Sequence, residues 1–282
     1  MTSLTHPIIP PDRLDDLHNI EFAADADLVL FMAGNQFMAM DELVAAFQAA
    51  HPQVQKIFYE TLPPGLELKQ ILAGGARFRD RSLTGCPDVY TAVNHQAMKR
   101  LAAAGHIDSG DDRLYLHNRL ALMVPKGNPA GIKAITDLGR EDVRISQPDP
   151  KNEDIAFHIM DMYRQAGGDA LVQRIMDTKR AEGTTVLTIV HHRETPLRIA
   201  KRTVDVGPVW ATEIINARAS GLACDVVEPG PQLDQRERIN YYVCCLKKAP
   251  HPENAAKFRA FIQSPTAQEI YARYGFIPPT DP

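Results

Sequence analysis

The sequence has 282 residues and a formal net charge of -4, with 44% hydrophobic, 7% aromatic and 23% charged residues. This composition is ordinary for a folded protein and argues against disorder, and the length is ample for two lobes of usual domain size. The charge creates no global basic field, so no nucleic-acid partner is expected, and no segment reaches the roughly 20 apolar residues that span a bilayer.

The N-terminal 26 residues lack a regular pattern. Residues 1–26 are predicted to form an irregular extension that contains Pro7, Pro10 and Pro11. The start of the sequence has neither a cationic segment nor an apolar stretch of signal-peptide length. The residues alone therefore predict either a cytosolic chain or a start that differs from that of the precursor.

Regular structure is predicted to start at residue 27. Residues 27–32 form a continuous apolar run, which is typical of a buried parallel strand. The helix expected after it carries apolar residues on one face, at the spacing i, i+3, i+4 and i+7: Met40, Leu43, Val44 and Phe47.

Strands and helices continue to alternate through the first hundred residues. A second strand is predicted at 54–59, and a helix is predicted to begin near Pro64 and to end at Gly74. The next segments are a solvated charged loop at 77–81, a strand at 88–90 and a helix at 96–104. This alternation predicts βαβ units and a mostly parallel sheet.

A second α/β series follows. Its expected strands lie at 120–124, 143–145, 205–210, 226–227 and 239–246, with a further segment at 184–192. One helix carries Ile155, Ile159 and Met162, and helices between 252 and 274 close the chain. The four cysteines have no zinc-ligand spacing and are predicted to be free thiols: Cys86, Cys224, Cys244 and Cys245.

Six stretches, taken in order, resemble the periplasmic molybdate-binding proteins that serve ABC transporters. They are 33–35 after the first strand, 68–75 followed by 86–90, 118–129, 147–150, 206–213, and 264–268 followed by 274–276. In the third stretch, Asn118-Arg119-Leu120-Ala121-Leu122-Met123-Val124-Pro125-Lys126-Gly127-Asn128-Pro129 is close to the family's "NxLVLVVPKGNP". The matches are collinear and extend from residue 27 to residue 278.

The resemblance implies an α/β fold with two doubly wound lobes joined by crossing strands, the type II periplasmic-binding-protein fold. Lobe one would comprise residues 27–118 plus 243–282, and lobe two residues 119–242. A small anion would be bound between the lobes, where helix N-termini converge. The resemblance further implies no cofactor, a monomer, an ABC transporter permease as partner and a periplasmic location, with the cytoplasm as the alternative.

An oxyanion requires inward-pointing hydrogen-bond donors, which helix N-termini supply through their unpaired N–H groups and macrodipole. The resemblance places Asn35 where the family has its first serine, and an amide side chain can also donate. At the second serine the backbone amides of Gly65 and Leu66 remain, because Pro64 offers no N–H. The alternative role of Asn35 is to cap the following helix.

The other candidate ligand-binding residues belong to the second lobe. They are Asn152, Ile155, His191, His192, Arg193, Glu194 and Trp210. Residues 152–155 lie at the third strand-to-helix junction and residues 191–194 open a helix, while Trp210 takes the place of the family's tyrosine. The alternatives are a polar helix start for residues 191–194 and core packing for Trp210.

The sequence therefore predicts a solute-binding protein that captures a molybdate- or tungstate-like oxyanion, and not an enzyme. No G-x-S-x-G, H-E-x-x-H or P-loop motif occurs. Two other functions stay open. The same clamp could bind a divalent metal or a small organic anion through residues 191–194, or the chain could be a cytosolic anion sensor.

Overall fold

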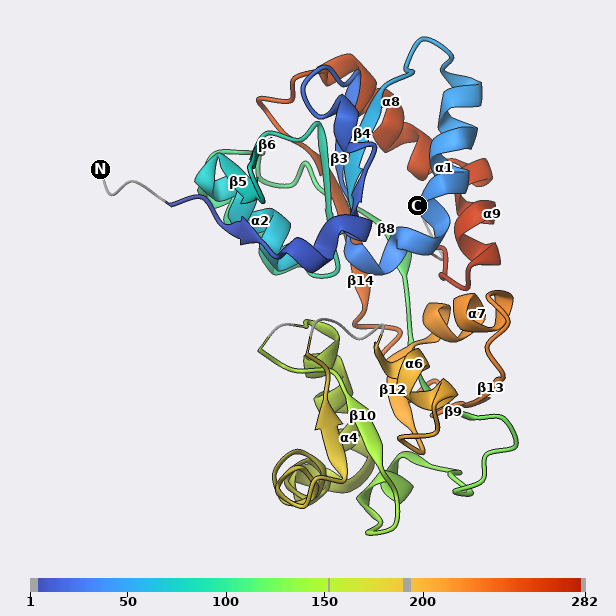
Figure 1. The fold of residues 1–282 in the computed structure, drawn as a ribbon. Helices are drawn as coiled ribbons and strands as arrows, with labels where there is room; N and C mark the ends of the chain where they lie inside the picture. Colours follow the sequence, from blue (N-terminus) through green and yellow to red (C-terminus); the bar gives the residue numbers. More distant parts are fainter. Residues whose placement is uncertain (1–4, 152, 190–193, 280–282) are drawn as a thin grey trace. The chain divides into compact units, whose positions relative to one another are not determined.

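The computed structural model describes residues 5–151, 153–189 and 194–279. The chain divides into two compact units, which are described separately (Figure 1). Unit 1 comprises Met1–His117 and Asn240–Pro282, and unit 2 comprises Asn118–Ile239. The polypeptide thus enters unit 2 after His117 and returns to unit 1 after Ile239.

A six-stranded sheet forms the centre of unit 1, in the order β2-β4-β3-β7-β14-β8. The strands are β2 (Leu17–His18), β4 (Ile57–Glu60), β3 (Leu28–Phe31), β7 (Val89–Ala92), β14 (Asn240–Cys245) and β8 (Arg113–His117). Strand β3 pairs parallel with β4 on one side and with β7 on the other. Because the strand order reverses at β3, the carboxyl end of β3 is a topological switch point, where open α/β sheets bind their ligands.

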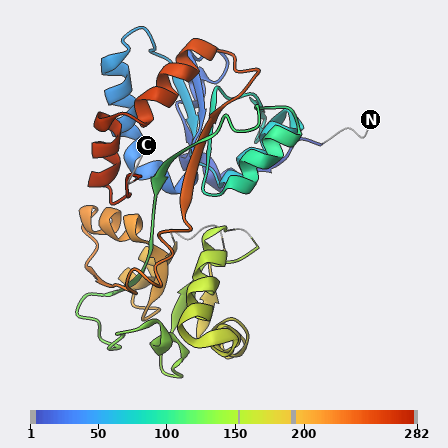
Figure 2. The same cartoon turned by 180° about the vertical axis from the view of Figure 1, so that it is seen from behind.

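Helices cover both faces of this sheet. They are α1 (Phe37–Ala50), α2 (Pro64–Ala73), α3 (His95–Ala103), α8 (Pro252–Ile262) and α9 (Pro265–Arg273). Figures 1 and 2 show α1, α8 and α9 on one face and α2 on the other. The predicted apolar face of α1 is confirmed, since Met40, Leu43, Val44 and Phe47 are all buried. No helix in the described part of the chain is both long and apolar enough to cross a membrane.

The prediction of an irregular N-terminal extension is wrong for residues 8–22. This segment forms β1 (Ile8–Ile9), the 3-10 helices η1 (Pro11–Asp16) and η2 (Ile20–Phe22), and the edge strand β2. Ile9 and Leu17 are buried. Strand β1 pairs with β5 (Gly75–Phe78) and β2 pairs with β4, in each case more than 40 residues further along the chain, so no local sequence pattern could reveal them.

The predicted solvated loop at 77–81 is also wrong. Strands β5 (Gly75–Phe78) and β6 (Arg81–Thr84) form a hairpin that pairs with β1. Ala76 and Phe78 are buried while Arg77 between them is exposed. The alternation has the period of a strand with one covered face, and the density of charged residues concealed it.

Unit 2 contains two small sheets. Strands β12 (Gly207–Trp210), β9 (Leu120–Pro125) and β13 (Cys224–Val227) form an antiparallel sheet, and β10 (Ile145–Gln147) pairs parallel with β11 (Thr185–Leu187). The helices are η4 (Ile135–Gly139), α4 (Ile155–Gln173), the π-helix η5 (Arg174–Thr178), α5 (Lys179–Ala181), α6 (Glu194–Ala200) and α7 (Ala211–Ala219). An isolated bridge between Ile145 and Val206 connects the two sheets.

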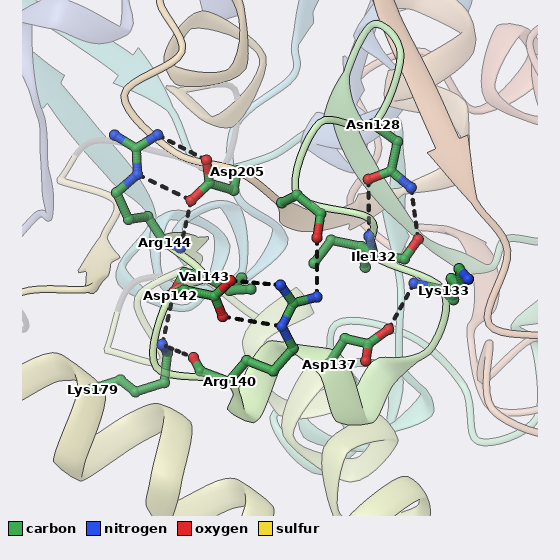
Figure 3. Close-up of polar contacts among 11 residues, drawn as sticks. Asn128, Ile132, Lys133, Asp137, Arg140, Asp142, Val143, Arg144, Lys179 and Asp205 are labelled. Atoms are coloured by element: carbon green, nitrogen blue, oxygen red, sulfur yellow. Dashed lines mark hydrogen bonds and ion pairs between the residues drawn. The ribbon is translucent and has the colours of Figure 1, made fainter.

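A buried lysine stabilises the segment of unit 2 between η4 and β10. Lys179 is fully buried, and its Nζ donates to the carbonyl oxygens of Arg140 at 2.5 Å and Val143 at 2.7 Å (Figure 3). Next to it, Arg144 forms an ion pair with Asp205 at 2.8 Å. Because the ammonium group satisfies carbonyls that β10 and η4 leave unpaired, Lys179 has a structural role.

The cysteines are free thiols, as predicted from their spacing. Cys244 is buried in β14 and its neighbour Cys245 is half-buried, in accord with the two faces of a strand. Burial raises the pKa of the Cys244 thiol, which keeps it protonated and unreactive.

Gly34, in the turn after β3, lies against the chain that leaves β4. A Cβ atom at Gly34 would come within 2.7 Å of the Thr61 carbonyl oxygen and 3.0 Å of that of Leu62. We therefore expect Gly34→Ala to lower the free energy of unfolding by about 1–3 kcal/mol, as overpacking does, in urea denaturation. Gly65→Ala is the control, since its Cβ would meet no atom within 4 Å. Equal stability of the two variants would contradict this packing.

Candidate functional site

The turn between β3 and α1 is held by hydroxyl groups from three other elements. The Ala33 amide donates to Thr91 Oγ1 at 2.7 Å. The side-chain oxygen of Gln36 accepts hydrogen bonds from Tyr115 at 2.8 Å and Tyr271 at 2.9 Å, and Gln36 Nε2 donates to Thr91 Oγ1 at 3.2 Å. These contacts fix the turn at the switch point of unit 1.

Asn35 lies in this turn, within the 3-10 helix η3 (Gly34–Gln36), and is 5% exposed. Its Nδ2 donates to the hydroxyl of Tyr241, while Oδ1 has no partner in the described part of the chain. No side-chain cap stands at the start of α1, so the capping alternative for Asn35 is wrong. The amide is half-satisfied and lies where ligands bind in this kind of sheet.

Gly65 and Leu66 occupy the first turn of α2. The carbonyl oxygen of Pro63 accepts from the Leu66 amide at 2.8 Å. Gly65 is exposed, with open space where a side chain would project. Of the two backbone amides predicted to donate to a ligand, the Leu66 amide is thus used inside the turn, and the Gly65 amide is the better candidate.

Two carboxyl groups are buried below this turn, and sequence reasoning missed both. Glu60 ends β4 and Glu67 lies in α2, and neither is exposed to solvent. Glu60 accepts from Gln70 Nε2 at 3.0 Å, and Glu67 accepts from the Leu62 amide at 3.2 Å. On each carboxyl group Oε2 has no partner among the residues described.

Burial controls the ionisation of this pair. It raises the pKa of Glu60 from 4.5 to about 8, against a smaller opposing effect of the hydrogen bond from Gln70. Burial, followed by the charge of Glu60, raises the pKa of Glu67 well above 4.5. The Glu60 carboxyl is therefore mostly neutral at pH 7, and negative charge is kept away from the N-terminus of α2.

In unit 2, Glu194 is held by its own surroundings. Its Oε1 accepts from the Ile189 amide at 2.9 Å, and its Oε2 pairs with Arg198 at 2.8 Å, one helical turn along α6. Arg198 also donates to Ser146 Oγ at 3.1 Å and to the Val186 carbonyl at 3.0 Å. These contacts give Glu194 a structural role, joining α6 to β10 and β11.

Two of the remaining predicted residues of unit 2, Ile155 and Trp210, lie in the described part of the chain. Ile155 begins α4 and is buried. Trp210 ends β12, is 2% exposed, and its ring lies 6.1 Å from that of His158; this favours core packing over a ligand wall. Burial lowers the pKa of His158. Asn152, His191, His192 and Arg193 lie outside the described residues.

One finding concerns metal binding in the described part of the chain. Across residues 5–151, 153–189 and 194–279, no group of three or more His, Cys, Asp or Glu side chains is placed to hold a metal ion.

Thr188 joins the carboxyl ends of β10 and β11. Its hydroxyl donates to buried Glu153 and accepts from the Asp149 amide at 3.0 Å. Glu153 thus fixes the segment before α4.

Arg198→Met should destabilise unit 2, because it removes the ion pair with Glu194 and the guanidinium donors to the carbonyl oxygens of Val186 and Leu187. We expect a loss of about 2–3 kcal/mol in the free energy of unfolding, as for hydrogen bonds to charged groups in partly buried places. Arg164→Met is the matched control, since its ion pairs with Asp161 and Asp169 involve a half-exposed guanidinium, and such pairs contribute less than about 1 kcal/mol. Equal losses in urea denaturation would contradict this role of Arg198.

Comparison with known structures identifies the class of fold. The structure is similar to the periplasmic molybdate-binding protein of Azotobacter vinelandii, with a TM-score of 0.70 and 18% identity over 90% of this chain and 100% of that one. It is also similar to the sulfate-binding protein SubI of Mycobacterium tuberculosis H37Rv, with a TM-score of 0.68 and 19% identity over 90% of this chain and 86% of that one. The α/β fold is that of the type II periplasmic binding proteins.

The sequence identifies the family. The model of the bacterial extracellular solute-binding proteins matches residues 28–277, and the chain belongs to that family. A protein of Bacillus subtilis (strain 168) named as an ABC transporter substrate-binding lipoprotein, YvgL, is 21% identical over 204 residues, which are 72% of each chain. The chain is therefore a transport-type binding protein for a small ligand and not an enzyme.

Proposed function

We propose that this protein captures a small oxyanion of the molybdate or tungstate type and delivers it to an ABC transporter permease. It would do so in the periplasm and as a monomer. The observation that carries the proposal is the Asn35 amide, which is nearly buried at the switch point of unit 1 and whose Oδ1 has no partner among the described residues. Because Oδ1 is an acceptor, the amide would turn over to present its two N–H donors to an anion.

The surroundings of Asn35 support an anion. Helix α1 begins directly after η3, and α2 begins at Pro64; both helices follow the carboxyl ends of adjacent parallel strands. Helix N-termini carry partial positive charge and unpaired N–H groups, and they bind anions for that reason. Gly65 is exposed in the first turn of α2, so its backbone amide is a further candidate donor.

The state of the buried carboxyl groups is compatible with an anionic ligand. Because the pKa of Glu60 is raised to about 8 and burial also raises that of Glu67, the negative charge that would repel an anion is reduced at neutral pH. A site for a divalent cation would favour the opposite arrangement, with ionised carboxylates directed at the ligand.

A thermal-shift panel on the purified protein, followed by calorimetry, tests the proposal. The panel contains molybdate, tungstate, sulfate, thiosulfate and phosphate. It also contains zinc, nickel and iron ions, which test the alternative of metal binding. A ligand present at 100 times its Kd should stabilise the protein by about 2.7 kcal/mol, which we expect for molybdate or tungstate. Stabilisation by a metal ion alone, or by no member of the panel, would overturn the oxyanion proposal.

A further inference from the structure

Two neighbouring amides in the turn after β3 differ in how far they are satisfied. Both ends of the Gln36 amide are used, because Oε1 accepts from Tyr115 and Tyr271 and Nε2 donates to Thr91. Among the described residues, only one end of the Asn35 amide is used, by the hydroxyl of Tyr241. Buried amides are normally paired at both ends, so the open end of Asn35 is available to a ligand.

The position of the Tyr241 hydroxyl is fixed by the packing of its ring. Tyr241 lies on β14 and is fully buried. Its ring makes edge contacts with Tyr115 at a centroid distance of 6.4 Å and with Phe276 at 5.7 Å. Because both neighbours come from other elements of unit 1, the hydroxyl is held at Asn35 by the core itself.

A tyrosine hydroxyl can donate as well as accept a hydrogen bond, so the Asn35 amide can face it in either orientation. In the structure Nδ2 faces Tyr241, and Oδ1 is the open atom among the described residues. An oxyanion has only acceptors to offer. With such a ligand the amide must turn, so that Oδ1 accepts from the Tyr241 hydroxyl and both N–H groups point to the anion.

We propose that Tyr241 is a positioning residue for ligand recognition. By donating to Oδ1 of Asn35, its hydroxyl holds the amide in the orientation that presents two N–H donors to the oxyanion. Tyr241 acts only through Asn35 and does not contact the ligand. The inference rests on the proposed oxyanion function and extends it to a residue that the sequence resemblance did not indicate.

A double-mutant cycle tests this role, with molybdate and sulfate as probes in titration calorimetry. The proteins are wild type, Tyr241→Phe, Asn35→Ala and the double variant. We expect Tyr241→Phe to weaken binding about tenfold, the equivalent of one hydrogen bond. In the Asn35→Ala background the same change should alter the affinity less than twofold, because the amide that Tyr241 positions is absent.

Tyr59→Phe is the matched control, since it removes another buried tyrosine hydroxyl of unit 1, which donates to Asp41 at 2.8 Å and not to the turn after β3. The affinity of this variant should stay within twofold of wild type. An equal loss from Tyr241→Phe in both backgrounds would mean that Tyr241 is only structural and would overturn the proposal. Wild type that binds neither anion, nor any other in the panel, would instead overturn the proposed function and this inference with it.

A second measurement on the wild-type chain covers the case in which Tyr241→Phe does not fold. The side-chain 15N–1H pair of Asn35 is assigned by its loss in Asn35→Ala. Saturation with molybdate should shift this pair and slow its exchange with solvent, because both protons gain an acceptor. An unchanged Asn35 signal in a protein saturated with molybdate would overturn the positioning role and leave anion binding itself intact.

Discussion

Replacing Glu60 with glutamine should make the protein more stable at pH 8 and leave its stability near pH 4 almost unchanged. Glu60 is fully buried, and burial raises its pKa from 4.5 to about 8. The folded chain therefore keeps a proton that the unfolded chain releases, and stability falls as the pH rises from about 4.5 to about 8. Glutamine retains an oxygen for Gln70 and has no charge to bury.

The size of this change in stability follows from the shift of the Glu60 pKa. One pKa unit corresponds to roughly 1.4 kcal/mol, so the change from 4.5 to about 8 sets an upper limit of about 5 kcal/mol on the stability lost at high pH. We expect Glu60→Gln to recover on the order of 2–4 kcal/mol of it at pH 8. Urea denaturation at pH 4, 6 and 8 gives the free energy of unfolding at each pH.

Glu269→Gln is the control for this series, because Glu269 is exposed on α9. Its stability should follow that of wild type at all three pH values. If the stability of Glu60→Gln differed from that of wild type by the same amount at pH 4 and pH 8, the pKa of Glu60 would be the same in the folded and the unfolded chain, contrary to its burial and its open Oε2.

Replacing Asn35 with aspartate should abolish most oxyanion binding while the fold persists. Aspartate matches asparagine in shape, and the Tyr241 hydroxyl can donate to it. The change removes the two N–H donors and places a negative charge at the switch point. Loss of a hydrogen bond to a charged ligand, with added repulsion, should weaken molybdate binding by at least about 100-fold, or about 2.7 kcal/mol, in titration calorimetry.

Asn94→Asp is the matched control for charge. Asn94 follows the neighbouring strand β7 and caps α3, where its Oδ1 accepts from the Ala97 amide at 3.0 Å. Aspartate keeps that cap, and the affinity for molybdate should change less than threefold. If Asn35→Asp bound molybdate as well as Asn94→Asp does, Asn35 would not contact the ligand.

The sequence predicted the regular elements wherever a local pattern was strong. The apolar run before Ala33 became β3, the one-face spacing became α1, and Gly74 ended α2 in the left-handed conformation, with φ of 76°. The pattern failed at residues 8–22 and 77–81, where β1 and β2 pair with distant strands and the β5–β6 hairpin is joined to the distant β1. Pairing energy of that kind leaves little trace in the local sequence.

The residues of the candidate site also fall into two groups, those that the sequence indicated and those that only the tertiary structure revealed. Asn35 and Gly65 were predicted from the family resemblance, which aligns them with two serines at strand-to-helix junctions of the family. Tyr241 was missed, since it lies in an ordinary apolar strand 206 residues away from Asn35. Glu194 was predicted to bind ligand because it opens a helix, and only the structure revealed the Arg198 guanidinium that pairs with it.

The sequence by itself determined that this chain is an α/β solute-binding protein, since alternating apolar patterns and six collinear motifs specify that fold. The tertiary structure decided which polar groups are satisfied. Whether Asn35 keeps an open hydrogen-bonding end, and whether Glu60 holds a proton at pH 7, depends on burial and on partners from distant strands. These are properties of the packed core, where an unpaired polar group or a buried charge costs more free energy than it does in water.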